Sequence, residues 1–309
     1  MSATFPTDHA ERLERVRLCL EGLSLGDAFG EKFFDPAHQA LFLPKRQLPP
    51  KSWPYTDDTA MALGIVEVLA QCGRIDQELL AQVFARNYAA APHRGYGATA
   101  RTVLQQIGAG VPWRQAAQAA FGGQGSLGNG GAMRSAVVGA YFADDLTRAA
   151  AEAKLSAEVT HLHPEGIAGA VAVAVAAGWA WQWRQYRGET DPVGLLHLAV
   201  KLTPAGDTQQ GIIHAADIPL EEWEYTAASA LGNGSGVIAP DTVPFALWCA
   251  AAHLNNFVDA MWTAARVGGD LDTNCAIIGG IVALAVGRDG LPAEWLGYRE
   301  SLPGLAQTL

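Results

Sequence analysis

Two short acidic clusters, more than two hundred residues apart, place the strongest constraint on how this chain can fold. They read Thr56-Asp57-Asp58-Thr59 and Asp270-Leu271-Asp272-Thr273, and each precedes a run of small and apolar residues typical of a helix. One such cluster alone is an ordinary helix N-cap, because Thr and Asp oxygens accept hydrogen bonds from free backbone N–H groups. Together they offer four carboxylates and up to three hydroxyls, hard ligands that suit Mg²⁺ or Mn²⁺ better than zinc.

A shared metal site requires the N-terminal and C-terminal thirds of the chain to pack together, which predicts one domain spanning residues 1–309. Adjacent side chains on a helix diverge by about 100°, so Asp57 and Asp58 would straddle two ions rather than chelate one. Asp270 and Asp272 would do the same from the other side. Two cations roughly 3.5 to 4 Å apart would polarise substrate oxygens and lower the pKa of a bound water.

The spacing of apolar residues predicts helices throughout the chain. No segment combines alternation with β-branched residues and hairpin turns, and the alternating Ala170–Val175 run is too long and too rich in alanine for a strand. The predicted fold is therefore all-α, a compact single-domain multi-helix bundle. The apolar stripes that indicate helices are Leu13/Val16/Leu20/Leu23, Met61/Ile65/Val68/Leu69, Leu80/Val83/Phe84, Val103/Leu104/Ile107, Met133/Val137/Val138/Tyr141 and Ile277/Ile278/Ile281/Val282.

Composition narrows the class of protein. The 31 acidic and 21 basic residues give a net charge of -10, which disfavours direct binding to nucleic acid or to an anionic membrane. The four cysteines show no Cys-x-x-Cys spacing, so we expect them to be reduced. The charged N-terminal residues lack the apolar stretch of a signal peptide, and the apolar run from Gly166 to Trp183 favours a buried helix. We therefore expect a cytoplasmic protein.

A glycine-rich segment between Phe121 and Gly131 is the second candidate functional element. Such a loop lets backbone N–H groups approach an oxyanion, although Gly-Asn-Gly alone is also an ordinary turn. Ser126 and Asn129 lie inside it, and Ala132-Met133-Arg134 is expected to begin a helix whose positive end faces phosphate. Gly232-Asn233-Gly234 is a weaker copy of the same pattern.

Two other sequence features, a histidine pair and a group of tryptophans, have simpler explanations than a functional site. The pair His161 and His163 has a spacing known from metal sites, but carboxylates are plentiful, so a hydrogen bond to substrate or a structural role is preferred. Trp179, Trp181 and Trp183 cannot share one helix face and are expected to pack. No Gly-x-Ser-x-Gly elbow and no phosphate loop ending in Lys-Ser or Lys-Thr occurs in the sequence.

Five motifs in order resemble those of the ADP-ribosylglycohydrolase family over nearly the whole chain. The resemblance implies a compact all-α fold with two divalent cations, Mg²⁺ or Mn²⁺, and hydrolysis at the anomeric carbon of ADP-ribose. An ADP-ribosylated protein or small ADP-ribosyl conjugate would be the substrate partner. The motifs are Gly26-Asp27-Ala28-Phe29-Gly30, Thr56-Asp57-Asp58-Thr59, Gly128-Asn129-Gly130-Gly131-Ala132-Met133-Arg134, Thr160-His161 and Gly268-Gly269-Asp270-Leu271-Asp272-Thr273.

Position by position, the resemblance implies three groups of site residues. The metal ligands would be Thr56, Asp57, Asp58, Asp270, Asp272 and Thr273. The substrate-binding residues would be Ser126, Gly128, Asn129, Gly130, Gly131 and His161. The catalytic carboxylates would be Asp57, Asp58 and Asp272, joined by Glu31.

The chain departs from the family pattern at one position. Family members often carry a glutamate seven residues after the aspartate of the first motif, where this chain has Phe34. Glu31, four residues after Asp27, is the expected replacement, and a solvated loop residue is the alternative. Two other functions remain open: a non-catalytic protein that keeps the fold and binds ADP-ribose, and a two-metal phosphohydrolase that cleaves the diphosphate.

Overall fold

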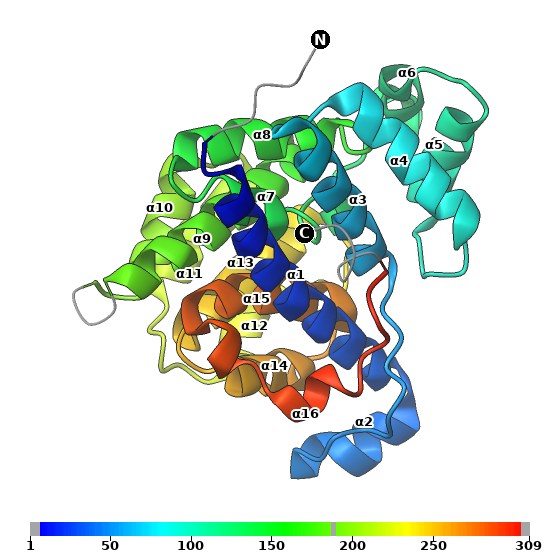
Figure 1. Ribbon diagram of the computed structural model, residues 1–309. Coiled ribbons are helices and arrows are strands. Elements are labelled where there is room, and N and C mark those ends of the chain that lie inside the picture. The colour runs from blue at the N-terminus through cyan, green and yellow to red at the C-terminus, as the bar shows by residue number, and fades with distance from the viewer. Residues whose placement is uncertain (1–6, 187–189, 304–309) are drawn as a thin grey trace.

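The computed structural model describes residues 7–186 and 190–303, and the regular structure in these ranges is helical (Figure 1). They contain no named β-strand, only isolated bridges between Trp53 and Arg299 and between Gly128 and Ile238. The all-α prediction is confirmed. The α-helices are α1 His9–Glu31, α2 Pro36–Phe42, α3 Asp57–Cys72, α4 Gln77–Ala90, α5 Ala98–Gly108, α6 Trp113–Gln118, α7 Ala136–Tyr141, α8 Leu146–Glu158, α9 Pro164–Gln185, α10 Gly194–Leu202, α11 Asp207–Asp217, α12 Glu224–Leu231, α13 Ala239–Ala252, α14 Phe257–Arg266, α15 Leu271–Val286 and α16 Ala293–Leu296.

Helices α1 and α15 pack backbone to backbone along their length. A Cβ added at Gly22 of α1 would lie 2.3 Å from Ala283 Cβ, and one at Gly26 would lie 2.0 Å from the carbonyl oxygen of Cys275. A Cβ at Gly30 would lie 2.3 Å from the Leu271 oxygen. Only glycine permits this approach, which places the end of α1 beside the beginning of α15 and therefore beside the second acidic cluster.

The first acidic cluster begins α3 as the cap pattern predicts. The side chain of Thr56, the N-cap, accepts a hydrogen bond from Asp58 N, and Gly73 ends the helix in the left-handed region with φ 64°. Helix α4 is capped in the same way by the Asp76 side chain, which accepts from Leu79 N. Helices predicted from the apolar stripes therefore begin and end at residues whose chemistry explains their limits.

Helix α9 runs through the centre of the protein. It is long and apolar enough to cross a membrane, but 78% of its apolar window is buried inside the protein. Ala170 to Ala177 are fully or almost fully buried, and Trp183 is 8% exposed. Trp179 and Trp181 are partly buried and pack against the same core. The run predicted as a buried helix is confirmed as one.

The helix expected to begin at Ala132 begins four residues later, at Ala136 in α7. Asn129 and Gly131 lie in a short 3₁₀ turn, and the Asn129 carbonyl oxygen accepts hydrogen bonds from both Ala132 N and Met133 N. The bonds from Ala132 N to Asn129 O and from Ser135 N to Ala132 O span three residues, as in a tight turn, and residues 132–135 are in turns. The prediction that a helix N-terminus at Ala132 faces a phosphate is therefore wrong.

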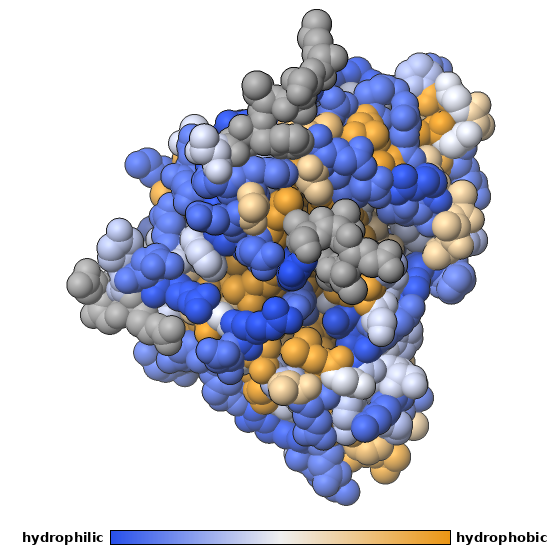
Figure 2. Space-filling view, in the orientation of Figure 1, coloured by the Kyte–Doolittle hydropathy of each residue, from blue (hydrophilic) through white to orange (hydrophobic). Residues whose placement is uncertain are grey.

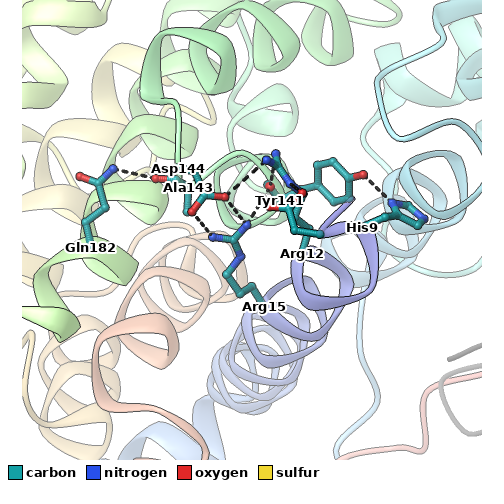
Figure 3. A network of polar contacts seen from close by, with 8 residues as sticks. His9, Arg12, Arg15, Tyr141, Ala143, Asp144 and Gln182 are labelled. Atoms are coloured by element: carbon teal, nitrogen blue, oxygen red, sulfur yellow. Dashed lines mark hydrogen bonds and ion pairs between the residues drawn. The ribbon is translucent and has the colours of Figure 1, made fainter. Parts of the chain in front are cut away.

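The N-terminal end of α1 is tied to the connection between α7 and α8 by polar contacts (Figure 3). Arg15 donates to both carboxylate oxygens of Asp144, at 2.8 and 2.6 Å, and His9 hydrogen bonds to the Tyr141 hydroxyl at 2.6 Å. Because both ends of α1 are anchored, its glycine-rich half is held firmly against α15.

On the face seen in Figure 2, hydrophilic residues dominate and apolar patches lie scattered among them.

Candidate active site

The two acidic clusters meet in one cavity of about 430 Å³, as their sequence predicted. The beginnings of α3 and α15 supply the carboxylates of one wall, and the glycine-rich segment supplies another. Ten of the predicted site residues line this cavity: Asp57, Asp58, Ser126, Gly128, Asn129, Gly130, His161, Asp270, Asp272 and Thr273. Thr56, Gly131 and Glu31 are not among its lining residues.

Asp27 of α1 lies beneath the first cluster and orients it. It is fully buried and accepts hydrogen bonds from Thr56 N at 3.1 and 3.0 Å, Thr59 N at 3.1 Å and Thr59 Oγ1 at 2.5 Å. Burial raises the pKa of Asp27 to about 6, although these hydrogen bonds favour its ionised form. In the sequence Asp27 is only one member of the Gly26–Gly30 motif, and in the structure it is the anchor between α1 and α3.

The pKa values of Asp57 and Asp58 are raised because their carboxylates are buried close to other carboxylates. Burial, followed by the charges of Asp27 and Asp270, raises the pKa of Asp57 to about 7. The pKa of Asp58 is raised well above its ordinary value by burial and then by the charge of Asp272. Asp58 Oδ2 accepts from Thr56 Oγ1 at 3.2 Å, but Asp58 Oδ1 is buried without a hydrogen-bond partner.

The second cluster packs against the loop Gly232-Asn233-Gly234, which the sequence pattern had indicated as a weaker phosphate loop. Asn274 Nδ2 donates to the Asn233 carbonyl oxygen at 2.7 Å, and a Cβ added at Gly234 would lie 2.8 Å from Asp270 Cβ. Gly232-Asn233-Gly234 therefore packs against the acidic cluster instead of cradling phosphate. Asp272 accepts from Thr273 N at 2.9 Å, and its pKa is raised well above the ordinary value by burial and by the charge of Asp270.

The donor set suits a hard divalent cation. In residues 7–186 and 190–303, no three His, Cys, Asp or Glu side chains already converge in a metal-holding group. The carboxylates are instead held by neighbours, as when Asn129 Nδ2 donates to Asp270 Oδ2 at 2.6 Å. The orphaned Asp58 Oδ1 and the raised pKa values of its neighbours are what an added positive charge would relieve. The residues of the cavity therefore fit a divalent cation, while the assignment of the individual ligands stays a prediction.

His161 faces the glycine loop as a neutral imidazole. Its Nδ1 lies 2.7 Å from Thr160 Oγ1, which also accepts a hydrogen bond from Arg134 at 2.8 Å. Burial, reinforced by the charge of Arg134, lowers the pKa of His161 to about 3. Because the Thr160 hydroxyl hydrogen needs an acceptor, we assign it to Nδ1, which leaves an N–H donor on Nε2 beside Gly128 and Gly130.

Arg134 has a structural role behind the cavity. It is fully buried, donates to the Ser156 carbonyl oxygen at 3.1 Å, and stacks 4.6 Å from the centre of the Phe84 ring. It is not among the residues that line the cavity. Its guanidinium therefore orients Thr160 and His161 from behind.

Glu31 is the last residue of α1 and is partly exposed. Its neighbour Gly30 packs against Asp272, but Glu31 itself is not a lining residue. Burial raises its pKa. Residues that the sequence did not single out complete the cavity: Gly95, Gly97, Ala98, Thr99, Ala100, Gly236, Val237 and Ile238.

Stability in the absence of divalent cations is expected to fall as the pH rises from about 4 to 8. The pKa values of Asp27 and Asp57, about 6 and about 7, lie above the ordinary 3.8. The folded form therefore binds more protons than the unfolded form in this window, and it loses that advantage as these groups ionise. A cation that replaces the protons should stabilise more at pH 8 than at pH 5.5.

Thermal unfolding at both pH values, with EDTA or Mn²⁺, measures this linkage. Asp57→Asn should lose less stability between pH 5.5 and 8 than the unmodified protein, since it removes one of the titrating groups. If the stability of the two proteins depends on pH in the same way, Asp57 does not titrate in this range and the prediction is contradicted.

Comparison with known proteins agrees with the fold and with the family resemblance of the motifs. Residues 8–309 match the family model described as ADP-ribosylglycohydrolase. The chain is 30% identical to ADP-ribosylhydrolase ARH3 of Homo sapiens, over 97% of this chain and 94% of that protein. It is 26% identical to ADP-ribosylarginine hydrolase Tri1 of Serratia proteamaculans, over 97% of this chain and 80% of that protein.

A solved structure titled "ADP-ribosylglycohydrolase-related protein complex" shares the fold, with a TM-score of 0.65 and 25% identity over 94% of both chains. The family model and the names of these relatives place the chain among hydrolases that act on ADP-ribosyl groups. The chain belongs to the ADP-ribosylglycohydrolase family, as its five motifs indicated.

Proposed function

We propose that this protein is a cytoplasmic, metal-dependent hydrolase that cleaves the bond at the anomeric carbon of ADP-ribose. Its substrate would be an ADP-ribosylated protein side chain or a small ADP-ribosyl conjugate, and its product free ADP-ribose. One observation carries the proposal: two acidic clusters distant in sequence line the same cavity as the glycine loop and His161. The names of the relatives support the same substrate class.

Two Mg²⁺ or Mn²⁺ ions would be held by oxygen atoms of the two clusters. When bound, they would bind ribose hydroxyls, activate a water and offset negative charge. The proposed ligands are Thr56, Asp57, Asp58, Asp270, Asp272 and Thr273.

The glycine loop offers donors for the diphosphate and ribose. Gly128 to Gly131 have no side chains except that of Asn129, so backbone N–H groups can approach phosphate oxygens closely. The neutral His161 adds its Nε2 donor at the same place. Phe121 and Val237, 59% and 56% exposed, line the cavity and offer apolar surface to a nucleobase.

Proton transfer falls to the carboxylates. Asp57, Asp58 and Asp272 are placed to accept the proton of an attacking water, because all three line the cavity. Glu31 is the proposed acid: burial raises its pKa, so it keeps its proton to higher pH than an ordinary glutamate, and since it does not line the cavity it would act from the adjoining end of α1. Cleavage through an oxocarbenium-like transition state fits this pairing of carboxylates.

Turnover of a panel of arginine-, serine- and O-acetyl-linked ADP-ribose substrates tests the function. Products are separated by chromatography, with EDTA controls. We expect free ADP-ribose from at least one linkage. AMP and ribose phosphate would instead identify a phosphohydrolase, and ADP-ribose binding without turnover of any substrate would identify a non-catalytic member of the family.

A further inference from the structure

The segment from Gly95 to Ala100 forms a wall of the cavity beside the first acidic cluster. Gly95 and Gly97 line the cavity together with Ala98. A Cβ added at Gly95 would lie 3.4 Å from Asp57 Oδ1, and Gly95 has a φ of +95° that favours glycine. The backbone of this segment therefore fixes how much room remains beside the Asp57 carboxylate.

Arg94 holds this wall in place through contacts to two other segments. Its Nη1 donates to the Tyr55 carbonyl oxygen at 2.8 Å, and its guanidinium lies 3.8 Å from the centre of the Tyr55 ring. It also forms a two-pronged pair with Glu300, in which Nη1 and Nη2 each donate to one carboxylate oxygen at 2.7 Å. The pair lies outside the cavity, since neither residue lines it.

Backbone hydrogen bonds hold Glu300 beside Trp53, in the segment that precedes the first acidic cluster. Glu300 N donates to the Trp53 carbonyl oxygen at 2.9 Å, and Trp53 N donates to the Tyr298 carbonyl oxygen at 2.9 Å. Figure 1 shows the C-terminal segment, in red, running beside the light-blue segment that leads into α3. Trp53 is fully buried, so this pairing has a fixed base.

We propose that Arg94 and Glu300 are positioning residues that hold the Gly95–Ala100 wall against Asp57 and so set the affinity for the ADP-ribosyl ligand. This inference rests on the proposed function of the cavity. A two-pronged guanidinium–carboxylate pair fixes direction as well as distance, which a lysine cannot reproduce. The Arg94 side chain is 14% exposed and that of Glu300 39%, so the pair is partly shielded from water.

The test compares Glu300→Gln and Arg94→Lys with the unmodified protein. Both variants should bind ADP-ribose about 10- to 100-fold more weakly in calorimetry, since small displacements in a binding site have effects of this size. In turnover, KM should rise more than kcat falls. Amide hydrogens of residues 95–100 should exchange faster, while those of α15 stay protected.

The pair between Arg86 and Glu67 provides a matched control. It has the same two-pronged form, with Nη1 to Oε1 at 3.0 Å and Nη2 to Oε2 at 2.5 Å, and it joins α4 to α3 away from the cavity. Glu67→Gln should leave ADP-ribose affinity and exchange at residues 95–100 unchanged.

Equal effects of Glu300→Gln and Glu67→Gln would show a general contribution to stability and overturn the proposal. Unchanged exchange at residues 95–100 in both Glu300→Gln and Arg94→Lys would overturn it as well. If the unmodified protein releases no ADP-ribose from any substrate, the proposed catalysis fails, but amide exchange still decides whether Arg94 and Glu300 hold the wall.

Discussion

Replacing Asp57 or Asp272 with alanine is expected to lower metal-dependent turnover by at least about 10²- to 10³-fold, the loss typical of removing one preorganised electrostatic contact. Both residues line the cavity, and each carries a pKa raised first by burial. The helices should persist, because neither side chain belongs to the apolar core. Turnover at saturating Mg²⁺ or Mn²⁺, with circular dichroism, measures both parts of the prediction.

Two comparisons separate the site from the scaffold. Asp57→Asn keeps the shape but removes a charge that the cavity disfavours, so its cation-free form should unfold at a higher temperature while turnover is lost. Asp289→Ala, just beyond the other end of α15, changes an exposed carboxylate and should keep full turnover. Unchanged turnover in both Asp57→Ala and Asp272→Ala would refute the assignment of the two-metal site.

Gly26→Ala is expected to destabilise the protein by about 3 kcal/mol or more, at the upper end of the usual cost of overpacking. The new Cβ would lie 2.0 Å from the Cys275 carbonyl oxygen, and backbone has to move to admit it. Since Cys275 follows Asp272 by three residues on α15, turnover should fall too. Denaturant-induced unfolding measures the loss of stability.

Gly108→Ala is the matched control for that change. Gly108 ends α5, and the nearest atom to an added Cβ there is Ala85 Cβ at 3.9 Å. Stability should stay the same or increase by up to about 1 kcal/mol, as for glycine replaced in an unstrained helix. Equal effects at Gly26 and Gly108 would contradict the backbone contact between α1 and α15.

The helices and the acidic clusters could be predicted because their determinants are local. Thr56 caps the beginning of α3 with its side chain, and Gly73 ends the helix because glycine tolerates a positive φ. Both residue types can be recognised in the sequence. The meeting of the two clusters was predicted from chemistry: two sets of hard oxygen ligands, far apart in sequence, can share metal ions only if the fold brings them to one place. The structure places both clusters on one cavity.

Other features depend on contacts between distant segments and left no local signal. Asp27 belongs to the Gly26–Gly30 motif, but its role depends on backbone N–H groups some thirty residues away, which the motif does not reveal. Arg94 and Glu300 are 206 residues apart and meet only in the folded chain. Ala132 N donates to Asn129 O and Ser135 N donates to Ala132 O, and these three-residue turns before α7 cannot be read from composition.

Glu31 illustrates a limit of transferring a residue by its spacing. Glu31 lies four positions after Asp27 on α1, so the two carboxylates lie about one helical turn apart. Asp27 is buried beneath the first cluster, whereas Glu31 lies partly exposed at the helix end. Glu31→Gln should reduce turnover and shift the basic limb of its pH profile if Glu31 supplies the proton, and an unchanged profile would assign that step to another group.

The most direct measurement is a cation titration of turnover. The protein is first treated with EDTA and dialysed, then given an ADP-ribosyl substrate cleaved by the untreated protein, and free ADP-ribose is followed as Mg²⁺ or Mn²⁺ is added. We predict no release without cation and saturable recovery with it, both absent in Asp57→Ala. Full release by the cation-free protein would contradict the proposal that these carboxylates act through divalent metal ions.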